Sequence, residues 1–155
     1  MEKTLVLLKP DCLLRGLVGR IIQRFEERGL VLVGLKMLQL SDEILQEHYQ
    51  HLADKPFFPG IVAAMQKTPV IALALAGVEA VRVAREMAGA TNAREAVNGT
   101  IRGDFAISIQ NNLVHISDSP QSAVAELKRF FSAEEVFAAP RAKLTICYSA
   151  DELTT

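Results

Sequence analysis

The sequence predicts a single domain of the α/β or α+β class. Its 155 residues are the length of one ordinary domain, and 50% of them are hydrophobic. That is enough for a sizeable core and excludes intrinsic disorder. Short apolar runs typical of strands alternate with segments in which apolar residues recur at helical spacing. No internal repeat, low-complexity tract or linker interrupts this order.

The N-terminal part of the chain predicts a strand and then a helix. Residues 4–8 form a short run rich in leucine and valine, ended by a Lys-Pro-Asp turn, which indicates a buried strand. Between Leu17 and Phe25 apolar residues recur at helical spacing, and Gly29 just beyond them is a typical helix stop.

The next segment predicts a second strand followed by two helices. Residues 30–40 alternate in hydropathy, which suggests that one side of the strand holds Val31, Val33, Leu35, Met37 and Gln39. Ser41, with two acidic residues behind it, is a good N-cap for the first helix. Residues 56–60, Pro-Phe-Phe-Pro-Gly, predict a rigid break, and residues 61–66 a short second helix.

The C-terminal half predicts two more strands and two more helices around an irregular stretch. Residues 70–76 and 113–116 are expected as strands, the second at a sheet edge, and residues 78–87 as a helix. Ser119-Pro120 is a strong start for the last helix. Between residues 89 and 103 the apolar periodicity fails. An irregular stretch of about fifteen residues inside a compact domain is typically functional or disordered, and its low serine and proline content and its place between strong elements favour a functional loop.

Composition excludes several classes of function. Lysine and arginine number 17 against 18 aspartates and glutamates, a net charge of −1. This argues against a protein that grips nucleic acid or anionic membrane, although a sum does not exclude a local cationic pocket. Cys12 and Cys147 are too few for a disulfide framework, so reduced thiols are expected. The N-terminus lacks a signal-peptide pattern, and the longest apolar run, residues 69–78, is too short to span a bilayer, so a cytoplasmic protein is expected.

The common phosphate-binding and nucleophile motifs are absent from the sequence. It contains no G-x-x-x-x-G-K-[ST], no G-x-G-x-x-G and no G-x-S-x-G. Phosphate-loop kinases, dinucleotide enzymes and α/β-hydrolases are therefore poor hypotheses.

Three histidines are candidates for chemistry. His48 and His51 lie three apart on a predicted helix and could share a metal, but no third ligand of matching spacing is nearby, so a solvent-facing pair is expected. His115 lies between an apolar strand and a capped helix, where the helix N-terminus favours an anion. A histidine satisfied by local backbone hydrogen bonds is an equally open interpretation at this point.

Three basic residues bear on the anion hypothesis. Lys9 ends an apolar strand, where an ammonium group is seldom fully buried without a partner. Arg85 lies on a predicted helix and Arg102 in the irregular stretch. Each by itself is typical of a solvated surface charge. Convergence of all three on one group would make a polyphosphate site, which sequence spacing does not show.

A set of dispersed motifs resembles the nucleoside diphosphate kinase family. The segments that carry the likeness run collinearly from about residue 4 to residue 135: Lys9-Pro10-Asp11, Arg15-Gly16-Leu17-Val18-Gly19, Arg24-Phe25-Glu26-Glu27-Arg28-Gly29, Gly34-Leu35-Lys36, Glu47-His48-Tyr49, Pro56-Phe57-Phe58, Gly89-Ala90-Thr91-Asn92, Gly99-Thr100-Ile101-Arg102-Gly103-Asp104-Phe105 and Asn112-x-x-His115-x-Ser117-Asp118-Ser119. The resemblance implies one domain over residues 1–155, with a ferredoxin-like βαββαβ core, an antiparallel sheet and additional helices.

The resemblance also implies an activity. The chain would be a Mg²⁺-dependent enzyme that transfers the γ-phosphate of a nucleoside triphosphate, typically ATP, to a nucleoside diphosphate by a ping-pong mechanism. It would thereby support the supply of CTP, GTP and UTP. Family members assemble as hexamers or tetramers of a common dimer, so a homo-oligomer is expected here. Neither a membrane nor a specific nucleic acid is expected as a partner.

By matched position, the resemblance assigns the catalytic residues. His115 would be the phosphorylated nucleophile, since a neutral imidazole is a competent nucleophile near pH 7. Glu126 would orient the imidazole, and Ser117 would hydrogen-bond to that carboxylate. Tyr49 would position Lys9 and the nucleophile.

The nucleotide contacts are assigned in the same way. The side chains that would hold the nucleotide are Lys9, Phe57, Arg85, Thr91, Arg102 and Asn112. The three cations and Thr91 would contact the phosphates, where fixed donors stabilise moving negative charge. Lys9 and Asn112 would also hold the ribose, and Phe57 would stack on the base whatever its identity. Asp118 would approach the magnesium ion through water.

Several positions depart from the family pattern. Ile116 follows the nucleophile where the family usually has glycine or another small residue. A left-handed backbone would cost a β-branched residue at least roughly 1–2 kcal/mol, so we expect an extended residue, a narrower rim and retained activity. Cys12 replaces a common glycine, and Asn98 replaces a frequent proline in the long loop. Residues 136–155 match poorly.

Two other functions stay open. One is a nucleotide-binding or regulatory module on the same scaffold, with catalysis blunted by Ile116. The other is sequence-specific nucleic-acid binding, which the net charge of −1 and the lack of a basic stripe weaken.

Overall fold

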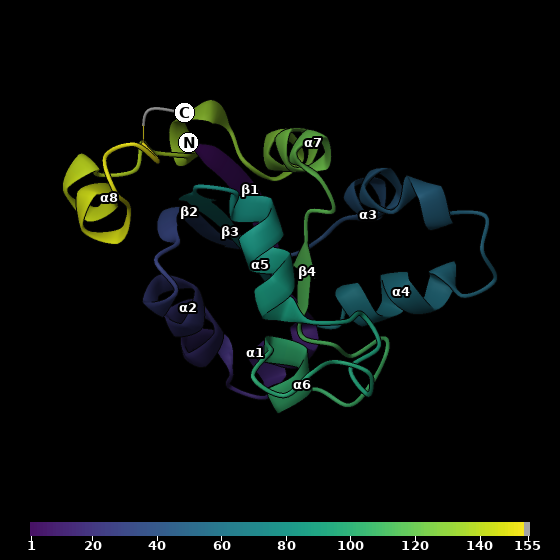
Figure 1. The fold of residues 1–155 in the computed structure, drawn as a ribbon. Helices are drawn as coiled ribbons and strands as arrows, with labels where there is room; N and C mark the ends of the chain where they lie inside the picture. The colour runs from purple at the N-terminus through teal and green to yellow at the C-terminus, as the bar shows by residue number, and fades with distance from the viewer. Residues whose placement is uncertain (154–155) are drawn as a thin grey trace.

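The computed structural model describes residues 1–153 and places a four-stranded antiparallel sheet at the centre of the fold (Figure 1). Its strands are β1 (Glu2–Leu8), β2 (Val31–Leu38), β3 (Val70–Gly77) and β4 (Val114–Ile116), in the order β2-β3-β1-β4. β1 pairs with β3 and β4, and β2 pairs with β3. This order, with helices connecting β1 to β2 and β3 to β4, confirms the expected ferredoxin-like core.

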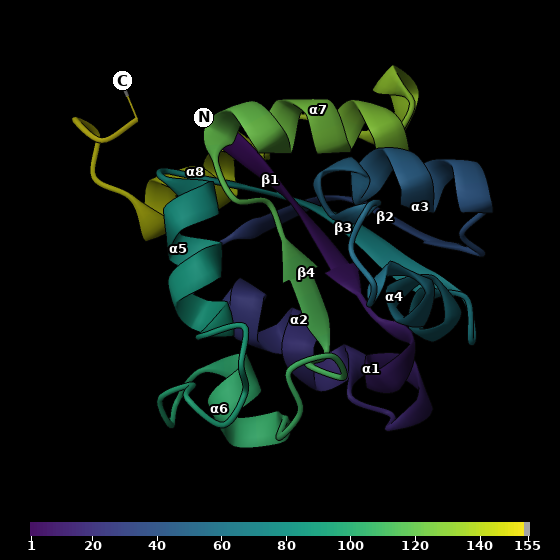
Figure 2. The same ribbon diagram turned by 90° about the vertical axis from the view of Figure 1, so that its right-hand side faces the viewer.

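Helices cover both faces of the sheet (Figures 1 and 2). They are α1 (Pro10–Leu14), α2 (Val18–Glu27), α3 (Asp42–His48), α4 (Phe58–Met65), α5 (Ala80–Ala88), α6 (Ile101–Phe105), α7 (Pro120–Phe130) and α8 (Arg141–Cys147), with short 3₁₀ turns at Gln50–Leu52 and Ala133–Glu135. Helices α2 and α5 pack on one face, and α3, α4 and α7 on the other. Within residues 1–153 no helix is long and apolar enough to cross a membrane.

The central strand β3 divides the core into two layers. All eight of its residues are buried. Ile71, Leu73 and Leu75 point into the layer with α2 and α5, whereas the alternate alanines pack against α3, α4 and α7. Alternation along a strand sends successive side chains to opposite faces, so small residues on one side let those helices lie close to the sheet.

The outer strand β2 corrects one expectation. Val31 and Val33 are buried, but Leu35 and Met37 are 52% and 61% exposed. The register of β2 against β3 shifts between Leu32 and Gly34, a β-bulge that places one extra residue in β2. An extra residue reverses the face of every later side chain, so the predicted single side from residue 31 to residue 39 is wrong.

Two helix boundaries also differ from the sequence-based expectation. Helix α4 begins at Phe58, so three of the five residues of the predicted rigid break are helical, with Pro59 in the first turn, where its missing N–H costs nothing. The irregular stretch ends in a short helix, α6, which Thr100 caps by accepting a hydrogen bond from the N–H of Gly103 at 3.0 Å. Asp104 pairs with Arg24 and accepts from the N–H of Gly99, which ties this stretch to α2.

The C-terminal segment packs along the sheet rather than away from it. The N–H of Phe137 donates to the carbonyl of Val33 on the outer edge of β2. Further on, the Tyr148 hydroxyl accepts a hydrogen bond from the N–H of Val78 at 3.3 Å, just beyond the end of β3. Both cysteines are free thiols, as expected: Cys12 is buried at the start of α1, and Cys147 is exposed.

Candidate active site

A cavity of about 560 Å³ opens where the C-terminal end of β1, strand β4 and helices α3, α4, α5 and α7 meet. This volume lies within the range of small-molecule sites. All but one of the residues singled out from the sequence line it: Lys9, Tyr49, Phe57, Arg85, Thr91, Arg102, Asn112, His115, Asp118 and Glu126. The exception is Ser117, which is fully buried behind Glu126.

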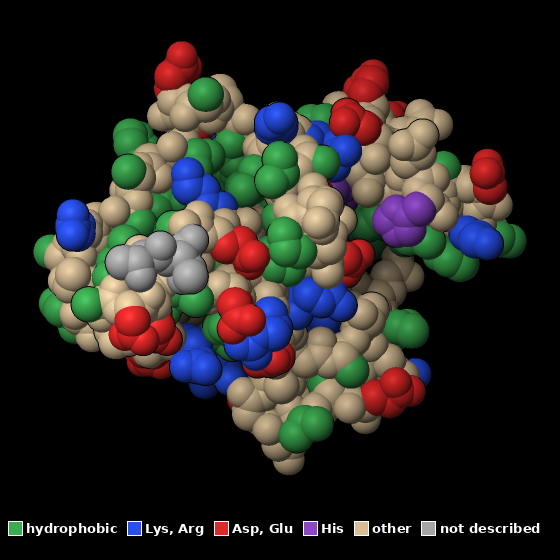
Figure 3. All heavy atoms as spheres, turned by 45° about the horizontal axis from the view of Figure 1, so that its top comes forward, with side chains coloured by type: hydrophobic (Ala, Val, Ile, Leu, Met, Phe, Trp, Pro, Cys, Tyr) green, Lys and Arg blue, Asp and Glu red, His purple; other side chains and the backbone are tan. Residues whose placement is uncertain are grey.

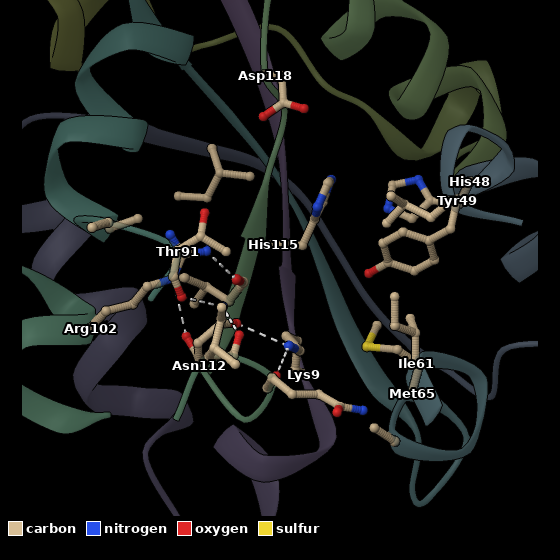
Figure 4. A pocket seen from close by; sticks show the side chains of 18 of the residues that line it. Lys9, His48, Tyr49, Ile61, Met65, Thr91, Arg102, Asn112, His115 and Asp118 are labelled. Atoms are coloured by element: carbon tan, nitrogen blue, oxygen red, sulfur yellow. Dashed lines mark hydrogen bonds between the residues drawn. The ribbon is translucent and has the colours of Figure 1, made fainter. Parts of the chain in front are cut away.

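His115 reaches the cavity because of its position in β4. It pairs with Leu7 of β1, and its neighbours Val114 and Ile116 point into the opposite core layer. The alternation of the strand therefore aims the imidazole toward α3 and α7. Figure 4 shows the ring between Thr91 and Arg102 on one side and His48 and Tyr49 on the other.

A carboxylate fixes the tautomer of His115. The imidazole Nε2 lies 3.2 Å from each oxygen of Glu126, and the Ser117 hydroxyl donates to Glu126 Oε2 at 2.7 Å. The N–H of Leu5 donates in turn to the Ser117 oxygen. Because a carboxylate only accepts hydrogen bonds, Nε2 carries the proton and Nδ1 keeps its lone pair. The neutral ring is thus held with one nucleophilic nitrogen.

The charge of Glu126 is maintained in spite of its burial. Burial by itself raises the pKa of this carboxyl group, but the interactions with His115 and Ser117 outweigh it, and the net pKa is lowered. An ionised carboxylate beside the ring stabilises positive charge on the imidazole.

Two cations on the opposite side of the cavity, the half-buried Lys9 and the buried Arg102, have lowered pKa values. Burial, opposed by Asp11 and reinforced by Arg102, lowers the pKa of Lys9 to about 8. Burial and the charge of Arg85 lower the pKa of Arg102 to about 10. Buried positive charges of this kind are costly in the absence of an anion, and they favour a phosphate ligand.

Each cation is held in place by the backbone around it. The Lys9 ammonium donates to the Gln110 carbonyl and, at 2.9 Å, to Asn112 Oδ1. The Arg102 guanidinium donates to the carbonyls of Gly89 and Val114 at 2.7 Å each. The structure therefore brings together residues that are up to 103 positions apart in sequence.

The turn before β4 sets the position of Asn112. Leu113, fully buried, has a φ of 73°, a left-handed conformation that is uncommon for a branched residue. The N–H of Leu113 donates a hydrogen bond to the Asp11 carboxylate, and the carbonyl of Leu113 accepts one from the N–H of Lys9, both at 2.9 Å. Asn112 consequently turns its amide toward Lys9 and toward the Thr91 carbonyl.

The remaining predicted residues lie at the rim. Phe57 is 56% exposed at the start of α4 and presents an open aromatic face. Arg85 pairs with Asp118 across the opening. Ile116 belongs to β4 and is 5% exposed, which confirms the expected extended backbone.

One residue at the site was misjudged from the sequence. His48 is buried, with its side chain fully shielded from solvent, whereas His51 is exposed, so the expected solvent-facing pair is wrong. Burial and the neighbouring His115 lower the pKa of His48 to about 3. The signal was present in the sequence, because Leu45 precedes His48 by three residues and therefore shares its helix face.

Comparison with known proteins gives a consistent result. The nucleoside diphosphate kinase family model matches residues 2–136. A nucleoside diphosphate kinase of Parabacteroides distasonis is 54% identical over 152 residues, 98% of this chain and 99% of the relative. Nucleoside diphosphate kinase A of Mus musculus is 48% identical, covering 87% of this chain and 89% of the relative. A solved halophilic nucleoside diphosphate kinase from Halobacterium salinarum, in complex with CDP, superimposes with a TM-score of 0.92 at 38% identity, over 96% of this chain and 99% of that one.

Proposed function

The chain belongs to the nucleoside diphosphate kinase family, an enzyme family that transfers phosphate between nucleotides, and from this premise we propose how its residues carry the transfer. In our proposal one domain spanning residues 1–155 passes the γ-phosphate of ATP or another nucleoside triphosphate to a nucleoside diphosphate by way of a phosphohistidine at His115. The observation that supports this most directly is the contact of His115 Nε2 with both oxygens of Glu126 at 3.2 Å.

In the first half-reaction, His115 Nδ1 attacks the γ-phosphorus. The bond from phosphorus to the β,γ-bridging oxygen breaks, and the nucleoside diphosphate leaves with that electron pair. Positive charge develops on the imidazole, and Glu126, held by Ser117, stabilises it. In the second half-reaction, a terminal phosphate oxygen of the acceptor diphosphate attacks phosphorus, the bond from phosphorus to Nδ1 breaks, and its electron pair returns to Nδ1, which restores the neutral ring.

The cationic side of the cavity binds the nucleotide in this proposal. Lys9, Arg85 and Arg102 offset the charge that spreads over the phosphate oxygens, with Thr91 as an additional donor. Lys9 and Asn112 hold the ribose hydroxyls, and Tyr49 positions Lys9 and His115. Phe57 stacks on the base, a contact that tolerates any base because each has a π face.

A magnesium ion fits the donor set that the cavity offers. Asp118 and Glu126 are the acidic residues of the lining, and Glu126 is already engaged by His115 and Ser117. Asp118 pairs with Arg85, but its side chain is 72% exposed at the rim, so it can still approach an ion. Mg²⁺ is typically held by one or two carboxylates, water and substrate phosphates. When bound, the ion supplies charge neutralisation at the phosphates.

The proposed function predicts a labelled protein. Incubation of the wild-type chain with γ-labelled ATP and Mg²⁺ should leave an acid-labile, base-stable label, and unlabelled GDP should remove it as labelled GTP. Chelation of Mg²⁺ with EDTA should prevent the labelling. A chain that binds nucleotide but takes up no label would contradict the proposed kinase activity and would favour a nucleotide-binding module instead.

A homo-oligomer built from dimers, a tetramer or a hexamer, is also part of the proposal. Strand β2 lies at a sheet edge and exposes Leu35 and Met37, and long apolar edge strands are seldom left free. Light scattering should therefore give the mass of four or six chains, and Met37→Glu should shift the population toward smaller species. A wild-type monomer at micromolar concentration would contradict this. The two free thiols fit a cytoplasmic, reducing location, which we propose as well.

A further inference from the structure

Two histidines and a glutamate converge on one point beside the candidate nucleophile. His48, His115 and Glu126 each offer a ligand atom, and these atoms all lie within 4.8 Å of one another. His115 Nε2 is 3.2 Å from Glu126 Oε1, and His48 Nδ1 is 3.9 Å from the same oxygen. They come from α3, β4 and α7, and all three line the cavity. We call them the imidazole–carboxylate cluster.

His48 has no part in phosphate transfer as proposed above, and its hydrogen-bonding capacity is almost unused. Its side chain is fully buried, and within residues 1–153 its Nε2 has no hydrogen-bond partner. Its Nδ1 has one long contact, 3.4 Å to Arg129 Nη1. A buried ring nitrogen without a hydrogen-bond partner is uncommon in a folded protein and calls for an explanation. Because its pKa is lowered to about 3, the ring is neutral. A guanidinium only donates, so Nδ1 holds the lone pair, facing Arg129 across the long contact, and the unpartnered Nε2 carries the proton.

We propose that the imidazole–carboxylate cluster binds a divalent transition metal such as Zn²⁺ and that this metal switches the enzyme off. Two imidazoles and one carboxylate are the ligands of many zinc sites that leave a fourth position open. In a tetrahedral site with bonds of about 2.0–2.1 Å, ligand atoms lie roughly 3.3 Å apart. One separation in the cluster is already 3.2 Å, and the others, at most 4.8 Å, would have to close by up to about 1.5 Å on metal binding.

The charges around the cluster permit a divalent cation, and its nitrogen ligands disfavour Mg²⁺. Arg129 lies beside His48, but Glu47 pairs with it at 2.8 Å and offsets its charge. The ionised Glu126 supplies the negative charge that a dication requires. Imidazole nitrogen suits zinc, copper or nickel, whereas Mg²⁺ prefers oxygen ligands in octahedral geometry. The cluster and the phosphate-bound magnesium would therefore not compete for the same ion.

The consequence for the enzyme follows from the tautomer of His115 and rests on the proposed function. In the metal-free ring Nε2 carries the proton and Nδ1 carries the lone pair. A metal that binds Nε2 takes the lone pair there, so the single proton of the neutral ring moves to Nδ1 through solvent. Protonated Nδ1 has no lone pair with which to attack phosphorus. The metal would thus block phosphorylation without touching the nucleotide-binding cations.

Metal binding is tested without nucleotide, so that its result is independent of kinase activity. Titration with Co²⁺ should give one visible-absorbing tetrahedral site per chain, and Zn²⁺ should displace it. His48→Phe, whose ring can keep the edge contacts with Tyr49 and Phe130, should weaken binding by roughly 10–100-fold or more. His51→Phe, three residues away and exposed, is the matched control and should bind as the wild type does.

Inhibition by the metal is tested by measuring how much phosphate label the protein takes up. Zn²⁺ in excess of nucleotide should abolish labelling of the wild type by γ-labelled ATP. For His48→Phe, labelling is compared with the level of the same variant without Zn²⁺. At least 10-fold more Zn²⁺ should be needed to inhibit this variant. His48→Gln, which is polar but has no imidazole, repeats the comparison if the phenylalanine variant does not fold. Equal metal affinity in the wild type and the His48 variants would overturn the site, and full labelling of Zn²⁺-loaded wild type would overturn the switch. A metal-free wild type that never labels, yet binds Co²⁺ through His48, would support the site while refuting the proposed function.

Discussion

Alanine at position 115 should yield a folded chain that takes no phosphate from ATP. In our proposal the imidazole accepts the γ-phosphate, and the neighbouring Glu126 is hydrogen-bonded to it and to Ser117. Covalent catalysis divides one difficult transfer into two easier ones, and its loss should lower kcat/KM for ATP-to-GDP transfer by at least roughly 10³-fold. Fluorescence or calorimetric titration should show that nucleotide binding persists.

The stability of that variant separates loss of chemistry from loss of structure. The His115 side chain is 19% exposed in the middle of the short edge strand β4, so the free energy of unfolding should fall by only about 1 kcal/mol. His51→Ala, an exposed histidine, is the control and should retain both activity and stability. Phosphate found on the His115→Ala protein would contradict the assignment of the nucleophile.

Methionine at position 9 should inactivate the enzyme and stabilise the unliganded fold. Removing one preorganised cation from the phosphate site should lower kcat/KM by about 10²–10³-fold. The gain in stability arises because burial lowers the pKa of Lys9 from 10.5 to about 8. At pH 7 the Lys9 ammonium is charged in both states, but in the folded chain it is partly removed from water. This lowers the free energy of unfolding by about 3 kcal/mol. Loss of the hydrogen bonds to Asn112 and Gln110 reduces the net gain to about 1–2 kcal/mol.

The pH dependence gives this prediction a definite sign. A group whose pKa is lower in the folded state penalises folding below the folded pKa, and the penalty disappears as the pH rises to the unfolded pKa. The stability difference between Lys9→Met and the wild type should therefore be largest below pH 8 and shrink between pH 8 and 10.5. Urea denaturation from pH 6.5 to 10.5 measures it, with the exposed Lys67→Met as control. A difference that stays constant over this range would contradict a buried charged Lys9.

Much of the fold could be predicted from the sequence, because apolar periodicity reflects burial. Strands β1, β2 and β3 and helices α2, α3 and α7 all coincide with their predicted segments to within a few residues. The bulge in β2 could not be predicted in the same way. Alternation of hydropathy continues through it, and only the pairing with β3 reveals the extra residue.

Less of the candidate site than of the fold could be predicted from the sequence. Physical reasoning from the sequence extended only to His115 as a candidate beside a helix start, and the remaining roles came from the family resemblance. Lys9 and Arg102 come together because β1 and β4 are neighbours in the sheet, a relation that no local window contains. His48 illustrates the reverse error. His51, the nearest histidine in sequence, lies exposed, whereas the contacts of His48 with His115 and Glu126 exist only in the folded chain.

The left-handed turn at Leu113 bears on when the site is assembled. A branched residue held there stores roughly 1–2 kcal/mol, which the contacts with Asp11 and Lys9 and a fully buried side chain offset during folding. The amide of Asn112 and the carbonyl of Val114, which receives Arg102, are thereby oriented before any nucleotide arrives. Little conformational entropy is left for the nucleotide to remove on this side of the cavity. Its binding energy can instead go toward aligning the γ-phosphate for transfer.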